Sequence, residues 1–598
     1  MARLSFNCFA LLVSTWRLTL LSGLAELIGN PFGTDMPRPW DGVKIGEDLS
    51  GDPGSEEALS RMRQWVSTCE QAHPRCHQER SFLPKRLLAI GEVGATHVYL
   101  WEPEKGSSAR YAALSYCWGG EDGIKTTTAN KERMKAGIAL DDIPLTMRHA
   151  IDIAQKLNIY HLWIDALCIL QDSMADWEIE SSHMAPIYQN AYLTIAADAS
   201  SSSSQGIYGV REEAQVQVTT WTNEQGLETI VKSRVMDPSE HVAHQAQAPL
   251  KGRGWALQED VLSNRLLTFG LHELQWRCRE VHTCECRFCE FGSVALPPIF
   301  TLETSHDATK AWYLYAMAYS RRSLTHTHDR LPALSGIASI LQIFTRWHYL
   351  AGIWFENCSE ELAWKLEGST PSIPCDAYAP ADSRLPTFSW LSVVDRTMVR
   401  NAYKHVVYHK DLNDDASVPE IVPHSWNCRS LGQNPFGLVT DAWIAVQGYL
   451  TPAQLRTTQK VSAVELASED LEPMYVVQFA EREEAFKPDV FIEETTLYFA
   501  ADGTPARTAH RAHPPAQAES HFARYFSRVD VPVMLLSLCR NVEAGQNGRG
   551  YRSYLVLAKS ARQPGCFERL GVLEVSYGSA SEWPSVPDSS LWTTVTLV

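Results

Sequence analysis

Three short blocks of the chain place polar and aromatic side chains at the end of an apolar run. They are residues 111–120 (YAALSYCWGG), 163–172 (WIDALCILQD) and 253–259 (RGWALQE). In an open α/β sheet, ligands bind beyond the carboxyl ends of the strands, where such side chains gather. The blocks therefore predict one shared site. Its candidate residues are Ser115, Tyr116, Trp118, Asp165, Asp172, Trp255 and Glu259.

Each candidate also has a purely structural interpretation. Tyr116 and Trp118 stack on a ligand ring in one interpretation and are core aromatics in the other. Asp165 and Asp172 are pocket acids or turn and helix-cap residues. Glu259 is a catalytic carboxylate or a structural partner of Arg253 or Arg265. Cys168 lies between the two acids, but a nucleophilic thiol needs a neighbouring base, and the sequence assigns none.

Two segments combine cysteine with histidine. The first holds Cys69, His73, Cys76 and His77, and the second holds Cys278, His282, Cys284, Cys286 and Cys289. Neither spacing matches a common zinc motif. We therefore favour a structural role for both segments, assign no metal ligand, and do not expect zinc at Cys278, Cys284, Cys286 and Cys289.

The elements that position these residues follow from apolar periodicity. It predicts strands at 98–101, 111–118, 159–165, 192–197, 266–269 and 274–277, and helices at 56–69, 144–157, 175–191 and 255–262. Pro186 should kink or shorten the third helix. Strands that alternate with helices predict an α/β domain with a doubly wound, mainly parallel sheet.

A chain of 598 residues exceeds one hydrophobic core. We expect an N-terminal extension and linker (1–60), the α/β domain (61–300), a helical segment (301–384) and a β-rich C-terminal region (385–598). A net charge of −17 opposes non-specific binding to nucleic acid. The 14 cysteines are scattered over the chain, which favours a reducing, cytoplasmic location.

Residues 6–28 are apolar but interrupted by Arg17. They match neither a signal peptide with a clear cleavage site nor an uninterrupted membrane span. We interpret them as an N-terminal extension and expect no membrane association, with a targeting segment as the alternative.

The three blocks, together with IPLTMRHAIDIAQKLNIYHLWID and WALQEDVLSNRLLTF, resemble the fungal heterokaryon-incompatibility (HET) domain. The resemblance runs from about residue 69 to residue 289 and keeps the order of the motifs. It implies fungal non-self recognition, in which fusion of unlike cells leads to programmed cell death triggered by the HET domain. Protein partners or self-association are expected for that role.

HET domains are thought to be related to Toll/interleukin-receptor (TIR) domains, which implies a TIR/flavodoxin-like core. TIR domains that cleave NAD use a glutamate on a helix with a W-x-x-E-like pattern. Here Trp255 and Glu259 are one residue further apart (WALQE) than in that pattern. On this resemblance Glu259 is the catalytic candidate, at a surface-facing helix position, and NAD is a candidate substrate.

Three functions remain open at this point. The HET domain triggers death by associating with partners, or it depletes NAD through Glu259, or the chain is a non-catalytic, metal-stabilised protein-binding module. A Glu259 side chain on an exposed convex surface would favour the first.

Overall fold

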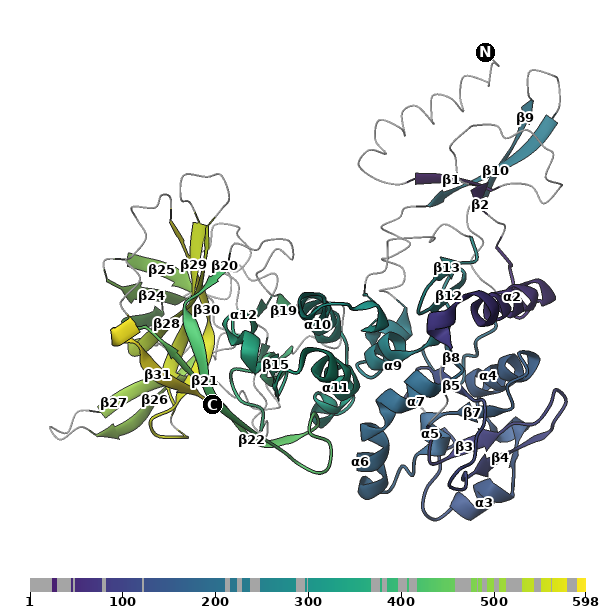
Figure 1. Cartoon of the computed structure of the whole chain (residues 1–598), viewed down its shortest axis with the longest axis horizontal. Coiled ribbons are helices and arrows are strands. Elements are labelled where there is room, and N and C mark those ends of the chain that lie inside the picture. Colours follow the sequence, from purple (N-terminus) through teal and green to yellow (C-terminus); the bar gives the residue numbers. More distant parts are fainter. Residues whose placement is uncertain are drawn as a thin grey trace, which may run out of the picture. The chain divides into compact units, whose positions relative to one another are not determined.

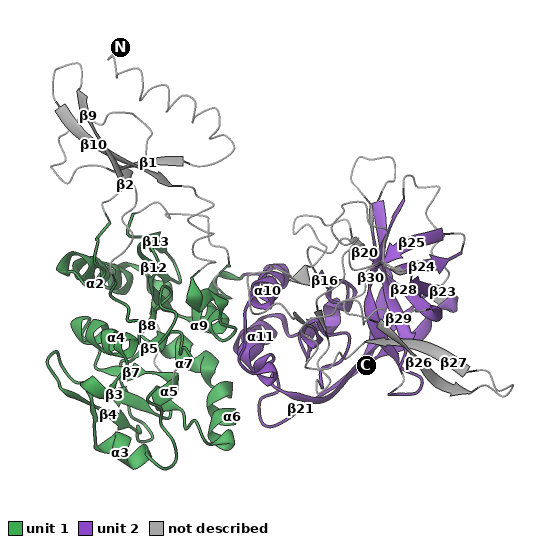
Figure 2. Ribbon diagram, turned by 180° about the vertical axis from the view of Figure 1, so that it is seen from behind, with its two compact units in different colours: residues 1–302 green, residues 303–598 purple. Residues whose placement is uncertain are grey.

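A computed structural model describes residues 49–77, 82–120, 123–209, 248–286, 299–366, 384–395, 417–457, 475–480, 482–486, 530–542, 550–560, 562–577 and 589–598, with shorter pieces before and between them. The chain divides into two compact units, Met1–Leu302 and Glu303–Val598 (Figure 2). Whether residues 301–384 and 385–598 fold as separate domains stays a prediction.

The first unit contains a nine-stranded sheet (Figure 1). In spatial order its strands are β13 (His282–Cys284), β12 (Leu274–Cys278), β11 (Arg265–Phe269), β8 (Leu193–Ala196), β5 (Ala112–Ser115), β7 (His161–Trp163), β3 (Leu87–Ala89), β4 (His97–Trp101) and β6 (Ile138–Ala139). The predicted strands are therefore present, with shifts of up to three residues at their ends.

The four central strands are parallel. β5 pairs in parallel with β7 and with β8, and β8 pairs in parallel with β11. All four residues of β5 are buried, as expected for a parallel strand that is covered on both faces. The outer pairs, from β7 to β6 and from β11 to β13, are antiparallel. The sheet is thus mixed, and the expected mainly parallel character holds only for its centre.

Helices cover both sides of these central strands, with α4 on one side and α6 and α7 on the other (Figure 1). The helices of this unit are α2 (Glu56–Ala72), α3 (Lys131–Ala136), α4 (Leu145–Lys156), α5 (Asp165–Cys168), α6 (Met174–Ser182), α7 (Met184–Asn190) and α9 (Ala256–Leu262). Ser55 caps α2, because its hydroxyl accepts a hydrogen bond from the backbone N–H of Ala58 (3.2 Å).

The predicted helix 175–191 is two helices, α6 and α7, that meet at His183. Pro186 occupies the first turn of α7, where its missing N–H costs no helical hydrogen bond. Ser173 caps α6 by accepting from Asp176 N (3.2 Å). The effect expected of Pro186 is confirmed.

A four-stranded sheet orders β2 (Ile45–Gly46), β1 (Leu24–Ile28), β10 (Glu228–Met236) and β9 (Val216–Thr222). In this sheet β1, at the end of the apolar N-terminal segment, pairs with β10, and β10 pairs with β9. The rest of that segment, including Arg17, lies outside the described residues. Among the residues described, none of the helices has both the length and the apolar character needed to cross a bilayer.

The second unit begins with α10 (Ser305–Ser320), α11 (Pro332–Thr345) and α12 (Cys358–Glu361). Thr304 and Asp307 form a capping box at the start of α10, which buries Trp312, Tyr315 and Tyr319. Short two-stranded pieces follow, namely β14 (Tyr349–Leu350), β15 (Ile353–Trp354), β16 (Lys365–Leu366), β17 (Ala377–Tyr378), β18 (Val394–Asp395) and β19 (Val406–Val407).

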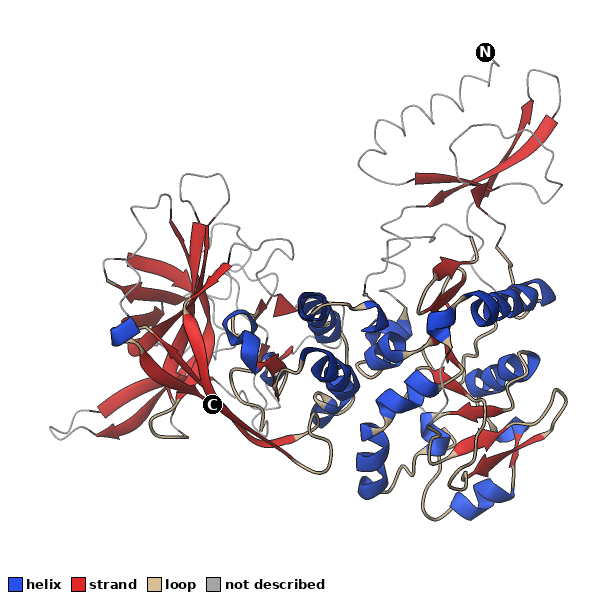
Figure 3. Cartoon of the chain, viewed as in Figure 1, coloured by secondary structure: helices blue, strands red, loops and turns tan. Residues whose placement is uncertain are grey.

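Strands dominate the end of the chain (Figure 3). They are β20 (Ser417–Pro419), β21 (Ile421–Ser430), β22 (Val439–Gly448), β23 (Leu450–Thr457), β24 (Tyr475–Phe479), β25 (Arg482–Phe486), β26 (Ile492–Phe499), β27 (Pro505–Arg511), β28 (Asp530–Val542), β29 (Gly550–Lys559), β30 (Phe567–Tyr577) and β31 (Thr593–Leu597). All but β26 and β27 join one sheet. The expectation of a β-rich C-terminal region is confirmed.

Candidate functional site

Ser115 and Glu259 are in direct contact, although 144 residues separate them in the sequence. Ser115 is the last residue of β5, and Glu259 lies in the first turn of α9. The Ser115 hydroxyl donates a hydrogen bond to Oε2 of Glu259. Both side chains are buried, Glu259 at 2% exposure. The expectation of a surface-facing Glu259 is therefore wrong, because α9 is inserted against the sheet and buries six of its seven residues.

Asp165 and Trp118 form a second contact at the same edge of the sheet. Asp165 follows β7 as the first residue of α5, and Trp118 follows β5. The indole N–H of Trp118 donates to Oδ2 of Asp165 (2.8 Å), and the backbone N–H of Ala166 donates to Oδ1 (2.7 Å). Asp165 thus accepts from the first turn of α5 and orients the indole, but the N-cap residue of this helix is Ile164.

Arg253 joins these two contacts into one charged cluster. Its guanidinium donates to the backbone carbonyl oxygen of Tyr116 and interacts electrostatically with Glu259 and Asp165. Burial by itself lowers the pKa of Arg253, but attraction to the two carboxylates outweighs it, and the net pKa is raised. We call Ser115, Asp165, Arg253 and Glu259 the β5-edge cluster.

One guanidinium beside two carboxylates leaves the second carboxylate without a balancing charge. Burial raises the pKa of Glu259 to about 7, against the lowering effects of Arg253 and the Ser115 hydroxyl. Burial likewise raises the pKa of Asp165. Glu259 therefore exchanges its proton close to neutral pH, which is a property of general acids and bases.

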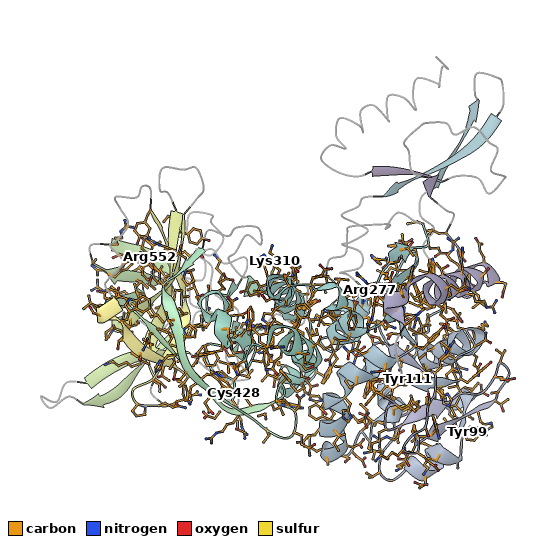
Figure 4. All side chains as sticks on the ribbon, viewed as in Figure 1. Tyr99, Tyr111, Arg277, Lys310, Cys428 and Arg552 are labelled. Atoms are coloured by element: carbon orange, nitrogen blue, oxygen red, sulfur yellow. The ribbon has the colours of Figure 1, made fainter. Side chains whose placement is uncertain are left out.

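Two tyrosines enclose the cluster. Tyr116 and Tyr188 are each 1% exposed, and burial raises the pKa of both well above its usual value. The Tyr188 hydroxyl donates to the carbonyl oxygen of Leu114 in β5 (3.1 Å). Tyr111 (labelled in Figure 4), at the start of the same run, donates to the carbonyl oxygen of Ile187 (2.6 Å). These contacts fix α7 to β5 behind the cluster.

The other sequence candidates have different surroundings. Asp172 is exposed and accepts hydrogen bonds from the N–H and hydroxyl of Thr128 (2.8 and 2.6 Å), which lower its pKa. Trp255 is the partly buried N-cap residue of α9. Burial raises the pKa of the Cys168 thiol to about 12, which opposes a nucleophilic role.

Sequence reasoning missed a group of ion-paired side chains near this edge. Asp198, 2% exposed, follows β8 and pairs with Lys251 (3.3 Å), which also pairs with Asp260 of α9 (2.7 Å). The signal was available, because Asp198 ends an apolar run just as Asp165 does. Arg253 opens the third block, and its expected interaction with Glu259 is present; only the fold adds Asp165 as a second carboxylate beside it.

The comparisons with known proteins bear on this same segment. Residues 111–259 match the family model described as "Heterokaryon incompatibility protein (HET)". No curated protein and no solved structure matches the chain. The matched segment begins at Tyr111 and ends at Glu259, so it contains every member of the β5-edge cluster. The resemblance to the HET domain is thereby confirmed for residues 111–259.

Proposed function

We propose that this protein acts in fungal heterokaryon incompatibility, where its HET domain triggers programmed cell death after non-self recognition. The observation that carries this proposal is that the matched segment and the β5-edge cluster coincide. A purely structural domain has no evident need for a buried glutamate whose pKa is raised to about 7, since unbalanced buried charge costs stability. We place the protein in the cytoplasm, acting through protein partners or self-association.

The strand order of the central sheet supports a ligand site at the cluster. Numbered along the chain, the parallel strands run second, first, third, fourth, so β5 stands where the strand order reverses. A doubly wound, TIR/flavodoxin-like core has this order, and such folds bind ligands at the carboxyl ends of the strands beside the reversal. Ser115 ends β5, and Asp165 and Asp198 follow its two neighbours.

A second candidate function, NAD cleavage, is favoured specifically by Glu259. Breaking the bond between nicotinamide and ribose develops positive charge on the ribose, and a nearby carboxylate stabilises that charge. In this mechanism Glu259 holds the ribose hydroxyls and the developing cation, and Trp118 stacks on a ring of the ligand. The approaching cationic nicotinamide ring favours the ionised form of Glu259. Because Glu259 is 2% exposed, the residues that cover it must move to admit the ligand.

Cell death and NAD cleavage are separated by expressing the full chain in a fungal host. We expect the wild type to arrest growth and Glu259→Ala to be tolerated at equal protein level. Glu178→Ala is the matched control, because Glu178 is an exposed glutamate of α6 and its loss should leave toxicity unchanged. If Glu259→Ala is as toxic as wild type, the cluster has no part in the death function.

The enzyme is tested on purified protein that is concentrated or artificially clustered, since TIR-type sites are often completed by a neighbouring subunit. Nicotinamide release from NAD by the wild type, lost in Glu259→Ala, supports catalysis. Clusters that are toxic in cells but release no nicotinamide would reject the enzyme and leave death signalling by association.

A further inference from the structure

The two cysteine- and histidine-containing segments, neither of which has zinc spacing by itself, meet in the fold. Cys69 lies in the last turn of α2, His73 ends that helix, and Cys76 ends the following 3₁₀ turn (Pro74–Cys76). Cys278 is the last residue of β12, 202 positions after Cys76. The thiol sulfurs of the three cysteines and a ring nitrogen of His73 all lie within 4.8 Å of one another.

We propose that Cys69, His73, Cys76 and Cys278 form a structural zinc site, which we call the α2–β12 site. A tetrahedral zinc ion with bonds of about 2.3 Å to sulfur and about 2.0 Å to nitrogen holds its ligand atoms roughly 3.5–3.8 Å apart. The Cys278 sulfur and His73 Nδ1 are 3.3 Å apart, and all six ligand-atom separations lie within 4.8 Å. Three thiolates with one imidazole is a common structural zinc set.

The surroundings of the sulfurs suit thiolates. The backbone N–H groups of Glu280 and Val281 donate to the Cys278 sulfur, as in a turn that presents a thiolate to a metal. Nε of Arg265 donates to the Cys69 sulfur (3.1 Å), and its NH2 group donates to the carbonyl oxygen of Cys76 (3.1 Å). Because charged groups hold thiolate ligands in place, these contacts act as an outer shell of the site.

Cationic side chains offset the thiolate charge at the α2–β12 site. Three thiolates and one divalent cation leave one net negative charge, which faces the guanidinium of Arg265 and interacts with that of Arg279 beside Cys76. Arg265 is 6% exposed, so an unbalanced site would leave a buried cation beside neutral thiols. The three cysteines are buried and free of disulfides, which keeps the thiols available to a metal.

The ion would tie α2 to the β11–β12 hairpin. Trp65 of α2 already stacks on Trp276 of β12 (6.4 Å between ring centroids), and Arg75 N donates to Glu280 (2.6 Å). A metal bond across this contact closes a loop of some 200 residues that contains the whole HET segment. The site therefore has a structural role apart from the β5-edge cluster.

A neighbouring group, Glu273, Cys284 and Cys286, supplies an internal comparison. Its three candidate ligand atoms also lie within 4.8 Å of one another. However, Oε2 of Glu273 accepts from Cys286 N (3.1 Å), and only three ligands are gathered among the residues that the structure describes. Cys289 lies outside the described residues. A structural zinc ion has four protein ligands, so the α2–β12 site is the better fit.

The experiment measures metal in the full chain purified under reducing conditions. We expect about one zinc ion per chain by atomic absorption, released by chelator or by acid, since thiolate ligands bind protons in its place. Cobalt(II) added to the stripped protein should give the visible absorption of a tetrahedral site together with sulfur-to-cobalt charge-transfer bands. A chain that holds neither metal when its thiols are reduced would overturn the proposal.

Variants assign the ligands. Cys278→Ser should lower zinc affinity by more than about 100-fold, the upper range for loss of a mere outer-shell partner. Cys284→Ser, the same change at a buried cysteine of the adjacent strand, should retain the metal. Loss of metal in Cys284→Ser with retention in Cys278→Ser would overturn the assignment, as would a native disulfide among Cys69, Cys76 and Cys278.

A third variant keeps the test decisive if Cys278→Ser does not fold. His73→Cys converts the proposed ligand set into four thiolates, so it should still bind cobalt, with stronger charge-transfer absorption than the wild type. An unchanged cobalt spectrum would mean that His73 is not a ligand, and the α2–β12 site would be rejected.

Discussion

Replacing Glu259 by glutamine should stabilise the protein at neutral and alkaline pH while removing its function. The carboxylate has an ordinary pKa of 4.5 in the unfolded chain and a pKa of about 7 in the folded protein. Below pH 4.5 it is protonated in both states and has no effect on the difference between them. As the pH rises from 4.5 to about 7, Glu259 loses its proton in the unfolded chain but keeps it in the folded protein, so folding becomes less favourable.

Above pH 7 the raised pKa of Glu259 lowers the free energy of unfolding by its full amount. At about 1.4 kcal/mol for each pKa unit, the rise from 4.5 to about 7 corresponds to about 3 kcal/mol. Glutamine has nearly the same shape, does not ionise, and its amide oxygen can still accept from the Ser115 hydroxyl. Because imperfect placement of the amide NH2 offsets part of the gain at every pH, we expect Glu259→Gln to be about 2–3 kcal/mol more stable than wild type at pH 8 and equal or slightly less stable near pH 4.5.

The assay is hydrogen exchange in increasing urea, which reports the free energy of unfolding for individual segments of the full chain. Peptides from β5 and β8 report the free energy of unfolding of the HET segment. Peptides from β28 and β29 are an internal reference, whose free energy of unfolding should be the same in variant and wild type. The measurement is repeated from pH 5 to pH 8.5, and the difference between variant and wild type should grow with pH through this range.

A Glu259→Gln variant that is less stable than wild type at pH 8 would refute the reasoning. So would a difference that does not depend on pH, because it would mean that Glu259 is ionised in the folded protein at every pH tested. A variant that is both more stable and inactive would show that the wild type retains an unfavourable buried charge for function.

Three substitutions test other parts of the structure by the same measurement. Arg86→Met should cost about 3 kcal/mol, because Arg86 (1% exposed) pairs with buried Asp176 and Glu180, and within the described part of the chain Lys85 pairs with Asp176 but not with Glu180; a change below about 1 kcal/mol would contradict this. Gly119→Ala should cost about 1–3 kcal/mol, since φ is +79° and the new Cβ would lie 2.7 Å from Cβ of Ser202; full stability would mean that this turn adjusts freely. Arg569→Met should lower the free energy of unfolding by about 2–3 kcal/mol in the second unit alone, because the fully buried guanidinium donates to two backbone carbonyl oxygens. A lower stability of β5 in this variant would contradict the prediction that only the second unit is affected.

The amino-acid sequence by itself determined the local elements and the family. Apolar periodicity located β5, β7, β8 and α4, because a strand buried on both faces needs an unbroken apolar run and a half-buried helix needs a stripe. Pro186 predicted the break between α6 and α7 for an equally local reason. The ordered motifs identified the HET domain without any knowledge of contacts.

Properties that depend on distant residues could not be obtained in this way. Burial of Glu259, its contact with Ser115 and its raised pKa arise because α9 packs on α7 and against the end of β5. Its helical pattern alone was compatible with a surface position. The antiparallel edges of the sheet were missed as well, since strand direction is set by connections and pairing partners rather than by the residues of the strand.

The two cysteine-containing segments show most clearly which properties follow from the sequence and which require the tertiary structure. The sequence placed Cys69, His73, Cys76 and His77 close together at the end of a predicted helix, but in a spacing that matches no common zinc motif. Tertiary structure alone brought Cys278 to them, by pairing β12 with β11 and packing both against α2. Local order follows from neighbours along the chain, whereas a site made of side chains 200 residues apart exists only after the chain has folded.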